Sequence, residues 1–356
     1  MIHNFNAGPS ILPDEVLQEA ARGVVNFNDT GLSILEIGHR TPLFESVLDE
    51  ARSLVRELMN LGAEYEVLFL HGGGTTQFME VPMNLLDESG TAAYIDTGVW
   101  SSKAISYAKQ FGKVEVVASS QDKNYTYIPK RFEIPPNAAY LHVTTNNTIY
   151  GTEWHNIPYT NGVPLVADAS SDIMSRVMDY SRFDLIYAGA QKNIGAAGTT
   201  LTVVKRSVLG NVKRKIPGIL DYRKHIEAGS MLNTPPVFAI YVSLLTLRWL
   251  KAQGGVAAID QVNTEKSALL YDALDRLPVF SPTVVKEDRS RMNACFVMKD
   301  PTLEQAFATR CQQEGMYGVK GHRSVGGFRI SMYNALPLSS VKDMVSLMED
   351  FAKQHG

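Results

Sequence analysis

Lys192 lies just beyond the apolar run FDLIYAGA at 183–190, which is typical of a buried strand. Small residues follow it in the stretch NIGAAGT at 193–199. Asp168 comes directly after a second apolar run, VPLVA at 163–167. A desolvated lysine has a lowered pKa and becomes a nucleophilic amine that forms Schiff bases. A buried carboxylate keeps a pyridine nitrogen protonated. The pair therefore predicts Schiff-base chemistry on a heteroaromatic ring.

Other side chains suited to ligand binding also follow apolar runs. They include the glycine loop HGGGTTQ at 71–77, Trp100, and the polar residues at 144–148. Taken singly, each has an ordinary structural explanation. The glycine loop lacks the third glycine of a dinucleotide fingerprint, and Trp100 suits core packing. Asp168 alone would be a helix cap, and Lys192 alone a solvated charge. Together they predict a pyridoxal phosphate site, with the phosphate at the glycine loop and Trp100 over the ring.

Alternating short strands and helices must position these residues. We expect strands at 65–73, 91–98, 113–119, 138–145, 163–170, 183–190 and 199–206, and helices at 76–86 and 101–112. Continuous apolar runs separated by crossovers favour a largely parallel sheet covered by helices. Ligands bind such sheets outside the carboxyl ends of the strands, which is where the candidate residues occur.

The C-terminal part has a different pattern. We expect a buried helix at 235–255 and a second long helix after it, then a strand at 291–298, a helix at 302–315, a hairpin-like segment at 318–334 and a last helix at 340–354. These elements are typical of a smaller α+β domain. We therefore predict an α/β fold with a large domain at 16–258 and a small domain built from 1–15 and 259–356.

Composition favours an ordinary globular protein. The 356 residues are 45% hydrophobic and 20% charged, with a net charge of -3, which favours neither nucleic acid nor an anionic membrane. The two cysteines, Cys295 and Cys311, lack the spacing of a zinc site, so we expect no metal and no disulfide. The N-terminus does not resemble a secretory signal, and no apolar stretch is long enough to span a bilayer. We expect a cytoplasmic protein.

Motifs along almost the whole chain resemble those of the phosphoserine aminotransferases, within the class-V aminotransferases and the fold-type I pyridoxal-phosphate enzymes. The motifs are FNAGPSILP at 5–13, GHRT at 38–41, HGGGTTQF at 71–78, TGVWS at 97–101, NNTIYGT at 146–152, VADASSD at 166–172, GAQKNIG at 189–195, NTPP at 233–236 and GHRSVGGFRISMYNA at 321–335. The pairing of GHRSVGGFR with an N-terminal GHR is specific to this branch.

The resemblance implies roles for cofactor-binding residues. Lys192 would carry the cofactor covalently, Asp168 would pair with its ring nitrogen, and Trp100 would stack on the ring. The remaining cofactor contacts implied are Thr148, Gln191, Gly74, Thr75, Asn233 and Thr234. The last two match positions that reach the cofactor phosphate of a neighbouring subunit, so the resemblance implies a homodimer.

The resemblance also implies the substrates, L-glutamate and 3-phosphohydroxypyruvate, which carry carboxylate and phosphate groups. Such anions call for arginine and imidazole groups. The candidates are His39, Arg40, His322, Arg323 and Arg329. Arg329 would hold the α-carboxylate, and the other four the distal anion, with His322 and Arg323 offered from the partner chain. Some relatives have an arginine where this chain has Thr75. With threonine at this position, one contact to the distal anion is lost.

The implied reaction is ping-pong transamination that yields O-phospho-L-serine and 2-oxoglutarate, with Lys192 as general base and acid. A phosphorylated four-carbon oxo acid would suit the same site, giving 4-phosphohydroxythreonine on the route to pyridoxal phosphate.

Four alternatives remain open at this point. A glyoxylate transaminase of the same fold has little use for so many cations, and a cysteine desulfurase needs a reactive loop cysteine, whereas Cys295 and Cys311 are expected in a strand and a helix. A non-catalytic binding module would have lost the lysine or gained a basic domain. A nicotinamide dehydrogenase would need the complete glycine fingerprint.

Overall fold

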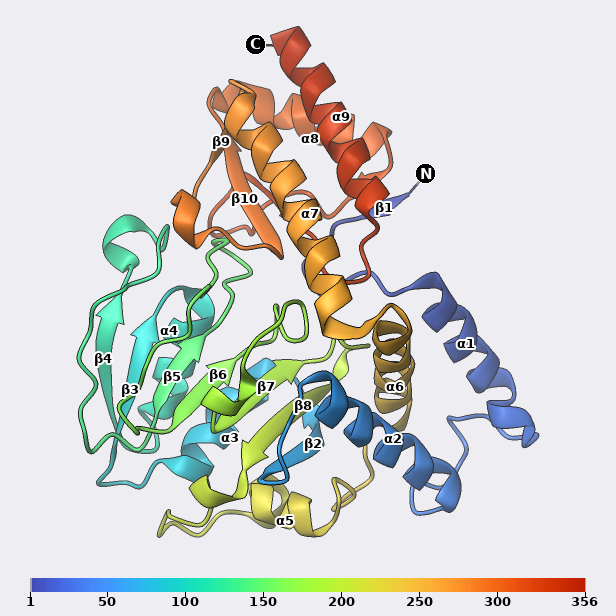
Figure 1. The fold of residues 1–356 in the computed structure, drawn as a ribbon, viewed down its shortest axis with the longest axis vertical. Helices are drawn as coiled ribbons and strands as arrows, with labels where there is room; N and C mark the ends of the chain where they lie inside the picture. The colour runs from blue at the N-terminus through green and yellow to red at the C-terminus, as the bar shows by residue number, and fades with distance from the viewer. Residues whose placement is uncertain (1, 356) are drawn as a thin grey trace.

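The structure, a computed structural model, describes residues 2–355 (Figure 1). The helices are α1 (Asp14–Val25), α2 (Pro42–Leu58), α3 (Gly74–Leu85), α4 (Val99–Ala108), α5 (Tyr222–Glu227), α6 (Val237–Ala252), α7 (Gly255–Arg276), α8 (Glu304–Gln313) and α9 (Leu338–His355). The strands are β1 (His3–Asn4), β2 (Tyr65–Gly72), β3 (Thr91–Asp96), β4 (Lys113–Ser119), β5 (Leu141–Thr144), β6 (Leu165–Asp168), β7 (Leu185–Gly189), β8 (Gly198–Lys205), β9 (Phe280–Pro282), β10 (Asn293–Met298), β11 (Met316–Tyr317) and β12 (Phe328–Ser331).

A seven-stranded sheet is the centre of the larger part of the molecule. Its strand order is β2-β8-β7-β6-β5-β3-β4. Strand β8 runs antiparallel to β2 and β7, and the other neighbours are parallel. This confirms the predicted α/β class with a mainly parallel sheet. Strands β5, β6 and β7 are buried along their whole length, as continuous apolar runs require.

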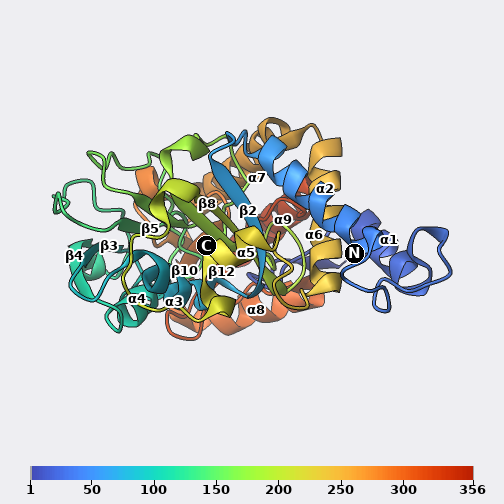
Figure 2. The same ribbon diagram turned by 90° about the horizontal axis from the view of Figure 1, so that it is seen from below.

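Helices cover both faces of this sheet, as Figure 2 shows in the view along its layers. Alternation along β2 divides its side chains: Val67 and Phe69 belong to the hydrophobic cluster under α2 and α6. Leu68 and Leu70 belong to the cluster under α3 and α4. Sheet and helices thus form three layers. Among residues 2–355, no helix combines the length and apolar character that crossing a bilayer requires.

A separate hydrophobic cluster lies in the C-terminal part. It joins Phe5 to buried side chains between Leu270 and Ala352. Strands β9, β10 and β12 form an antiparallel sheet here, and β1 pairs with β11, which ties the N-terminus to this part. The predicted boundary at 258 and 259 falls in the first turn of α7, which runs between the two parts in Figure 1. The clusters support the two-domain division, which stays a prediction.

Two local details differ from the sequence prediction. Helix α3 begins at Gly74, two residues before the predicted start, and continues through Pro82. The hairpin expected at 318–334 is short: a bridge joins Lys320 to Phe328, and only the second arm becomes a strand, β12. Strand β12 pairs with β10 in the small antiparallel sheet.

Candidate active site

The candidate site lies where β2, β5, β6 and β7 end at one edge of the large sheet. Asp168 is the last residue of β6 and Thr144 the last of β5. Lys192 is the third residue after the end of β7, and α3 begins at the second residue after the end of β2. Because these strands run in the same direction, their carboxyl ends gather the candidate residues as predicted.

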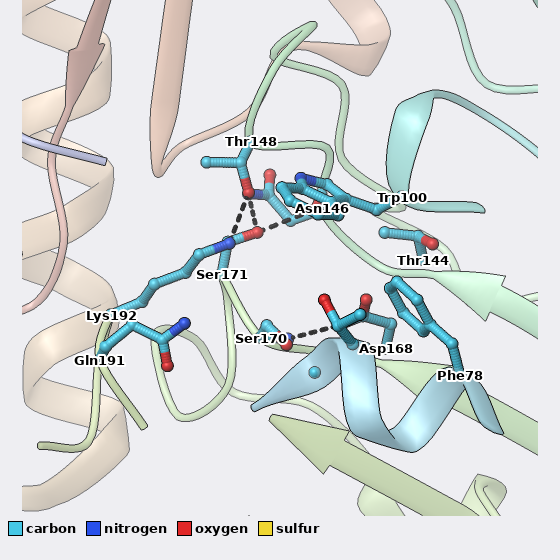
Figure 3. Close-up of a pocket in the computed structure, with 12 residues that line it drawn as sticks. Phe78, Trp100, Thr144, Asn146, Thr148, Asp168, Ser170, Ser171, Gln191 and Lys192 are labelled. Carbon is cyan, nitrogen blue, oxygen red and sulfur yellow. Dashed lines mark hydrogen bonds between the residues drawn. The ribbon is translucent and has the colours of Figure 1, made fainter. Parts of the chain in front are cut away.

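Lys192 reaches into the pocket from one side and Asp168 lies across from it (Figure 3). The Lys192 amine donates a hydrogen bond to Thr148 Oγ1 at 2.8 Å. The pKa of Lys192 is lowered to about 8, chiefly by burial; the Asp168 carboxylate opposes this shift, and the nearby Arg329 charge contributes to it. The amine is therefore far closer to its neutral, nucleophilic form than an exposed lysine would be.

Asp168 is buried at the end of its strand. Its Oδ1 accepts a hydrogen bond from the backbone N–H of Ser170 at 3.0 Å. The backbone carbonyl of Asp168 accepts from the N–H of Thr145 on the neighbouring segment at 2.9 Å, which fixes its place. Burial raises the pKa of Asp168, whereas Ser170 and Lys192 act to lower it. Such a carboxylate suits a cationic or hydrogen-bond-donating partner.

The N-terminus of α3 provides an anion cradle. Gly73 is the N-cap residue and Gly74 the first helical residue, so the first backbone N–H groups have no partner within the helix. Gly74 also lies close to the next segment: a Cβ atom at this position would sit 3.0 Å from Ser170 Oγ. A glycine at 74 therefore allows the helix end to approach the turn after Asp168.

The pocket collects most of the predicted cofactor residues. Those that line it are Gly74, Thr75, Trp100, Thr148, Asp168, Gln191 and Lys192. Five lining residues were given no individual role from the sequence, although Thr144 and Asn146 belong to the polar stretch 144–148 singled out there: Phe78, Thr144, Asn146, Ser170 and Ser171. For four of them the signal was present: Thr144 ends β5 and Asn146 follows it, while Ser170 and Ser171 follow Asp168 at the end of β6. Phe78 lies one helical turn after Gly74 and was hidden in an ordinary apolar pattern.

Unpaired polar atoms around the pocket indicate a missing polar ligand. Trp100 Nε1, Thr144 Oγ1 and Arg329 Nε are buried and have no hydrogen-bond partner within the described residues. Buried polar atoms in folded proteins are normally paired, so a bound group is the simplest partner. An amine, a carboxylate, an indole ring and a helix N-terminus around one pocket fit pyridoxal phosphate.

Of the predicted substrate residues, Arg329 lies nearest to the lysine. Arg329 Nη1 donates to the backbone carbonyl of Thr148 at 3.0 Å, so Thr148 contacts both cations. His322 lies on the same hairpin, where burial and the charges of Arg329, Arg323 and Lys103 lower its pKa. Lys103, which was not singled out from the sequence, stacks over Trp100 with its Nζ 4.8 Å from the ring centroid. This chain thus gathers several cations near the pocket.

Seven predicted residues do not line this pocket: Arg329, His322 and Arg323, described above, and four others. His39 and Arg40 lie in the loop that precedes α2. Asn233 lines a different cavity beside His71, and the carbonyl of Thr234 lies 2.6 Å from His71 Nε2. The structure of one chain therefore does not bring these four to Lys192.

Comparisons with known proteins agree with this geometry. The family model described as Aminotransferase class-V matches residues 2–344. A phosphoserine aminotransferase of Flavobacterium johnsoniae is 55% identical over 348 residues, which cover 98% of each chain. The solved structure of the phosphoserine aminotransferase from Bacillus circulans subsp. alkalophilus has a TM-score of 0.97 at 42% identity and covers 100% of this chain and 99% of its own. A PLP-bound phosphoserine aminotransferase from Trichomonas vaginalis has a TM-score of 0.93 at 34% identity and covers 98% and 100%.

Proposed function

We propose that this chain, which belongs to the aminotransferase class-V family and to its phosphoserine aminotransferases, transfers the amino group of L-glutamate to 3-phosphohydroxypyruvate. The products are 2-oxoglutarate and O-phospho-L-serine. The observation that carries the proposal is the Lys192 amine, held at 2.8 Å from Thr148 Oγ1 with its pKa lowered to about 8, in one pocket with Asp168.

Pyridoxal phosphate, when bound, supplies an aldehyde that captures amino groups and a ring that accepts electrons from the substrate carbon. Asp168 is proposed to hold a proton on the ring nitrogen. The free N–H groups at Gly74 and Thr75 are proposed to bind the phosphate. Trp100 would cover one face of the ring and exclude water.

The Lys192 amine is proposed to take a proton from the substrate carbon and return it at another atom. Its lowered pKa supports this role, because a general base works best when its pKa lies near the working pH. Thr148 accepts a hydrogen bond from the amine and thereby orients Nζ. The amine must also leave this position and come back in each half of a ping-pong cycle.

The substrate anions are assigned to the cations around the pocket. Arg329 is proposed to bind the α-carboxylate, since its Nε has no partner among residues 2–355 and its Nη1 is already fixed on Thr148. His39 and Arg40, together with His322 and Arg323 offered from the partner chain, are proposed to bind the distal phosphate or carboxylate. Two carboxylates or a carboxylate and a phosphate on one small substrate would balance this local positive charge.

A homodimer is part of the proposal. The pairs His322 with Arg323 and Asn233 with Thr234 do not line the pocket of their own chain, so they are available to a second copy. Exposed apolar side chains on and after α1, including Val25 (81% exposed) and Leu35 (62% exposed), support a partner on the surface that leads to His39. The cytoplasmic location remains a prediction.

The cysteine desulfurase alternative loses support from the burial of both thiols. Cys295 lies in β10 and Cys311 in α8, as expected from the sequence. Burial raises the pKa of each thiol to about 12, which removes the thiolate that such chemistry needs.

Steady-state assays of the holoenzyme test the proposed substrates. With L-glutamate as donor, we expect kcat/KM for 3-phosphohydroxypyruvate to exceed that for glyoxylate or pyruvate, because only the phosphorylated acid uses the distal cations. Replacing Arg323 by alanine should narrow this ratio, and replacing the exposed Lys353, far along α9, should leave it unchanged. A preference for glyoxylate would contradict the proposal.

A further inference from the structure

We propose that Asn193, the residue after Lys192, is a positioning residue that holds the lysine loop, the turn after Asp168 and the segment after Arg329 in one fixed arrangement. The proposal rests on the proposed function, in which Lys192 and Arg329 act on the same substrate. Asn193 is only 5% exposed and does not line the pocket. Its side-chain amide joins two segments through hydrogen bonds with Ile173 and Asn334, and its Nδ2 also lies 3.9 Å from Met292 Sδ.

The first contact ties the lysine loop to the segment that carries Asp168. Asn193 Nδ2 donates to the backbone carbonyl of Ile173 at 3.3 Å. Ile173 is in turn hydrogen-bonded to the beginning of the same segment, because its backbone N–H donates to the carbonyl of Ala169 at 2.9 Å. Asp168 immediately precedes Ala169, so the distance between the amine and the carboxylate depends on this contact.

The second contact ties the same loop to the C-terminal part of the molecule. Asn193 Oδ1 accepts a hydrogen bond from the backbone N–H of Asn334 at 3.0 Å. Asn334 follows β12, the strand that carries Arg329, by three residues. One side-chain amide therefore uses its donor toward the Asp168 turn and its acceptor toward the Arg329 segment.

The segment that Asn193 contacts is itself held firmly. Asn334 Nδ2 donates to the carbonyl of Met174 at 3.0 Å, and Asn334 Oδ1 accepts from Asn263 Nδ2 on α7 at 2.9 Å. One turn further along α7, the fully buried Lys266 amine donates to the carbonyls of Met332, Tyr333 and Leu336 at 2.8 to 3.1 Å.

This bonding makes Asn193 the point where two rigid units meet. Lys266 and Asn263 hold the 332–336 turn to α7. If the Asn193 side-chain amide is lost, this turn therefore stays in place while the lysine loop is free to shift. The lysine loop would then move relative to Arg329 and Asp168. A misplacement of about 1 Å at a reacting group lowers turnover by on the order of 10²-fold.

The experiment compares Asn193→Ala with a matched control, Asn84→Ala. Asn84 is also a buried asparagine, 2% exposed, whose Nδ2 donates to the carbonyls of Glu80 and Leu220 and whose Oδ1 accepts from the N–H of Tyr222. It bridges two segments as Asn193 does, but it does not line the pocket. A purely structural effect should therefore be similar in the two variants.

Three measurements separate positioning from stability. The first is thermal unfolding of both cofactor-free variants. The second is kcat and KM of the holoenzymes with L-glutamate. The third is the pH dependence of pyridoxal phosphate capture by cofactor-free protein, followed by borohydride reduction and mass spectrometry to locate the adduct. The third reports on the Lys192 amine without any turnover.

We expect both variants to lose a similar amount of thermal stability. Only Asn193→Ala should lose about 10²-fold in kcat, and only it should shift the pH midpoint of capture at Lys192. If Asn193→Ala matches the control in kcat, KM and midpoint, the proposal is wrong.

A second variant keeps the test decisive if Asn193→Ala does not fold. Asn193→Leu keeps the side-chain volume and adds no charge, but it removes both the donor to Ile173 and the acceptor for Asn334. We expect it to shift the capture midpoint as well, and an unchanged midpoint would overturn the proposal. Failure of the wild type to use 3-phosphohydroxypyruvate would instead refute the proposed substrate, and the capture measurement would still decide the role of Asn193.

Discussion

At the scale of single residues, the protonation of Lys192 is decided by competing effects. Burial favours the neutral amine, and the Arg329 charge acts in the same direction. The Asp168 carboxylate favours the ammonium form but does not offset burial. The pKa of about 8 leaves a substantial neutral fraction near neutral pH, whereas an ordinary lysine would be almost wholly charged.

This balance predicts how cofactor capture depends on pH. In cofactor-free protein, the rate of pyridoxal phosphate capture at Lys192 should rise with pH and level off above about 8, because only the deprotonated amine attacks an aldehyde. Stopped-flow absorbance checks this. A rate that keeps rising up to pH 10 would mean that the amine has the ordinary pKa of a solvated lysine.

The same residue gives a test of the chemistry. Lys192→Ala should lose at least about 10²–10⁴-fold in turnover, the range expected for loss of a general acid–base group. Borohydride treatment of this variant should leave no cofactor attached to the protein. The exposed Lys353 provides a control, since Lys353→Ala should retain full turnover and covalent cofactor.

At the scale of elements, α3 links the phosphate cradle to a buried polar chain. Gln77 Oε1 accepts from the Tyr222 hydroxyl at 2.6 Å, and its Nε2 donates to the Glu80 carboxyl group. Burial raises the pKa of Glu80 to about 7, and the bond from Gln77 only partly opposes this. Glu80 therefore keeps its proton in the folded protein at pH values where the unfolded chain has lost it.

The sign of the resulting pH dependence follows from linkage. The raised pKa of Glu80 contributes stability that is fully present below pH 4.5 and is lost as the pH rises through about 7. Glu80→Gln removes this titration. We expect the variant to gain stability relative to wild type between pH 5 and 8, by on the order of 3 kcal/mol.

Urea unfolding at pH 5, 6.5 and 8 measures this difference. The matched control is Glu88→Gln, which changes an exposed carboxylate just beyond the end of α3 and should show no such trend. Parallel stability curves for wild type and Glu80→Gln would contradict the raised pKa.

At the scale of the whole molecule, the proposed homodimer predicts complementation between two inactive variants. Lys192→Ala lacks the amine, and Arg323→Ala lacks a cation that we propose acts in the partner's pocket. In a hybrid of the two, one of its two sites would hold both groups. Random pairing of the chains should therefore restore about a quarter of wild-type activity in a symmetric dimer.

Co-expression gives this mixture, and purification on two affinity tags isolates the hybrid alone, which should have about half of wild-type activity at limiting 3-phosphohydroxypyruvate because one of its two sites is intact. Each variant alone should remain poorly active under these conditions. If Arg323 instead serves the pocket of its own chain, the hybrid contains no intact site and its activity stays at the level of the single variants.

The local sequence pattern was enough to predict most of the helices and strands and about half of the residues that line the pocket. The apolar runs before Asp168 and Lys192 predicted strands β6 and β7, and parallel strands must end at one edge. The start of α3 at Gly74 was missed because its first turn contains glycine and threonine, which are weak helix formers held in place here by tertiary contacts.

The amino-acid sequence by itself determined the order of the elements and the chemistry, because period and residue type are local properties. Only the tertiary structure decided the pKa of Lys192. Its burial depends on packing, and so does its closeness to Arg329, which lies 137 positions later in the chain (329 − 192). It also decided that His39 and Asn233 do not line the pocket of their own chain. Contacts such as Asn193 to Asn334 arise where distant segments meet, and spacing along one segment carries no information about them.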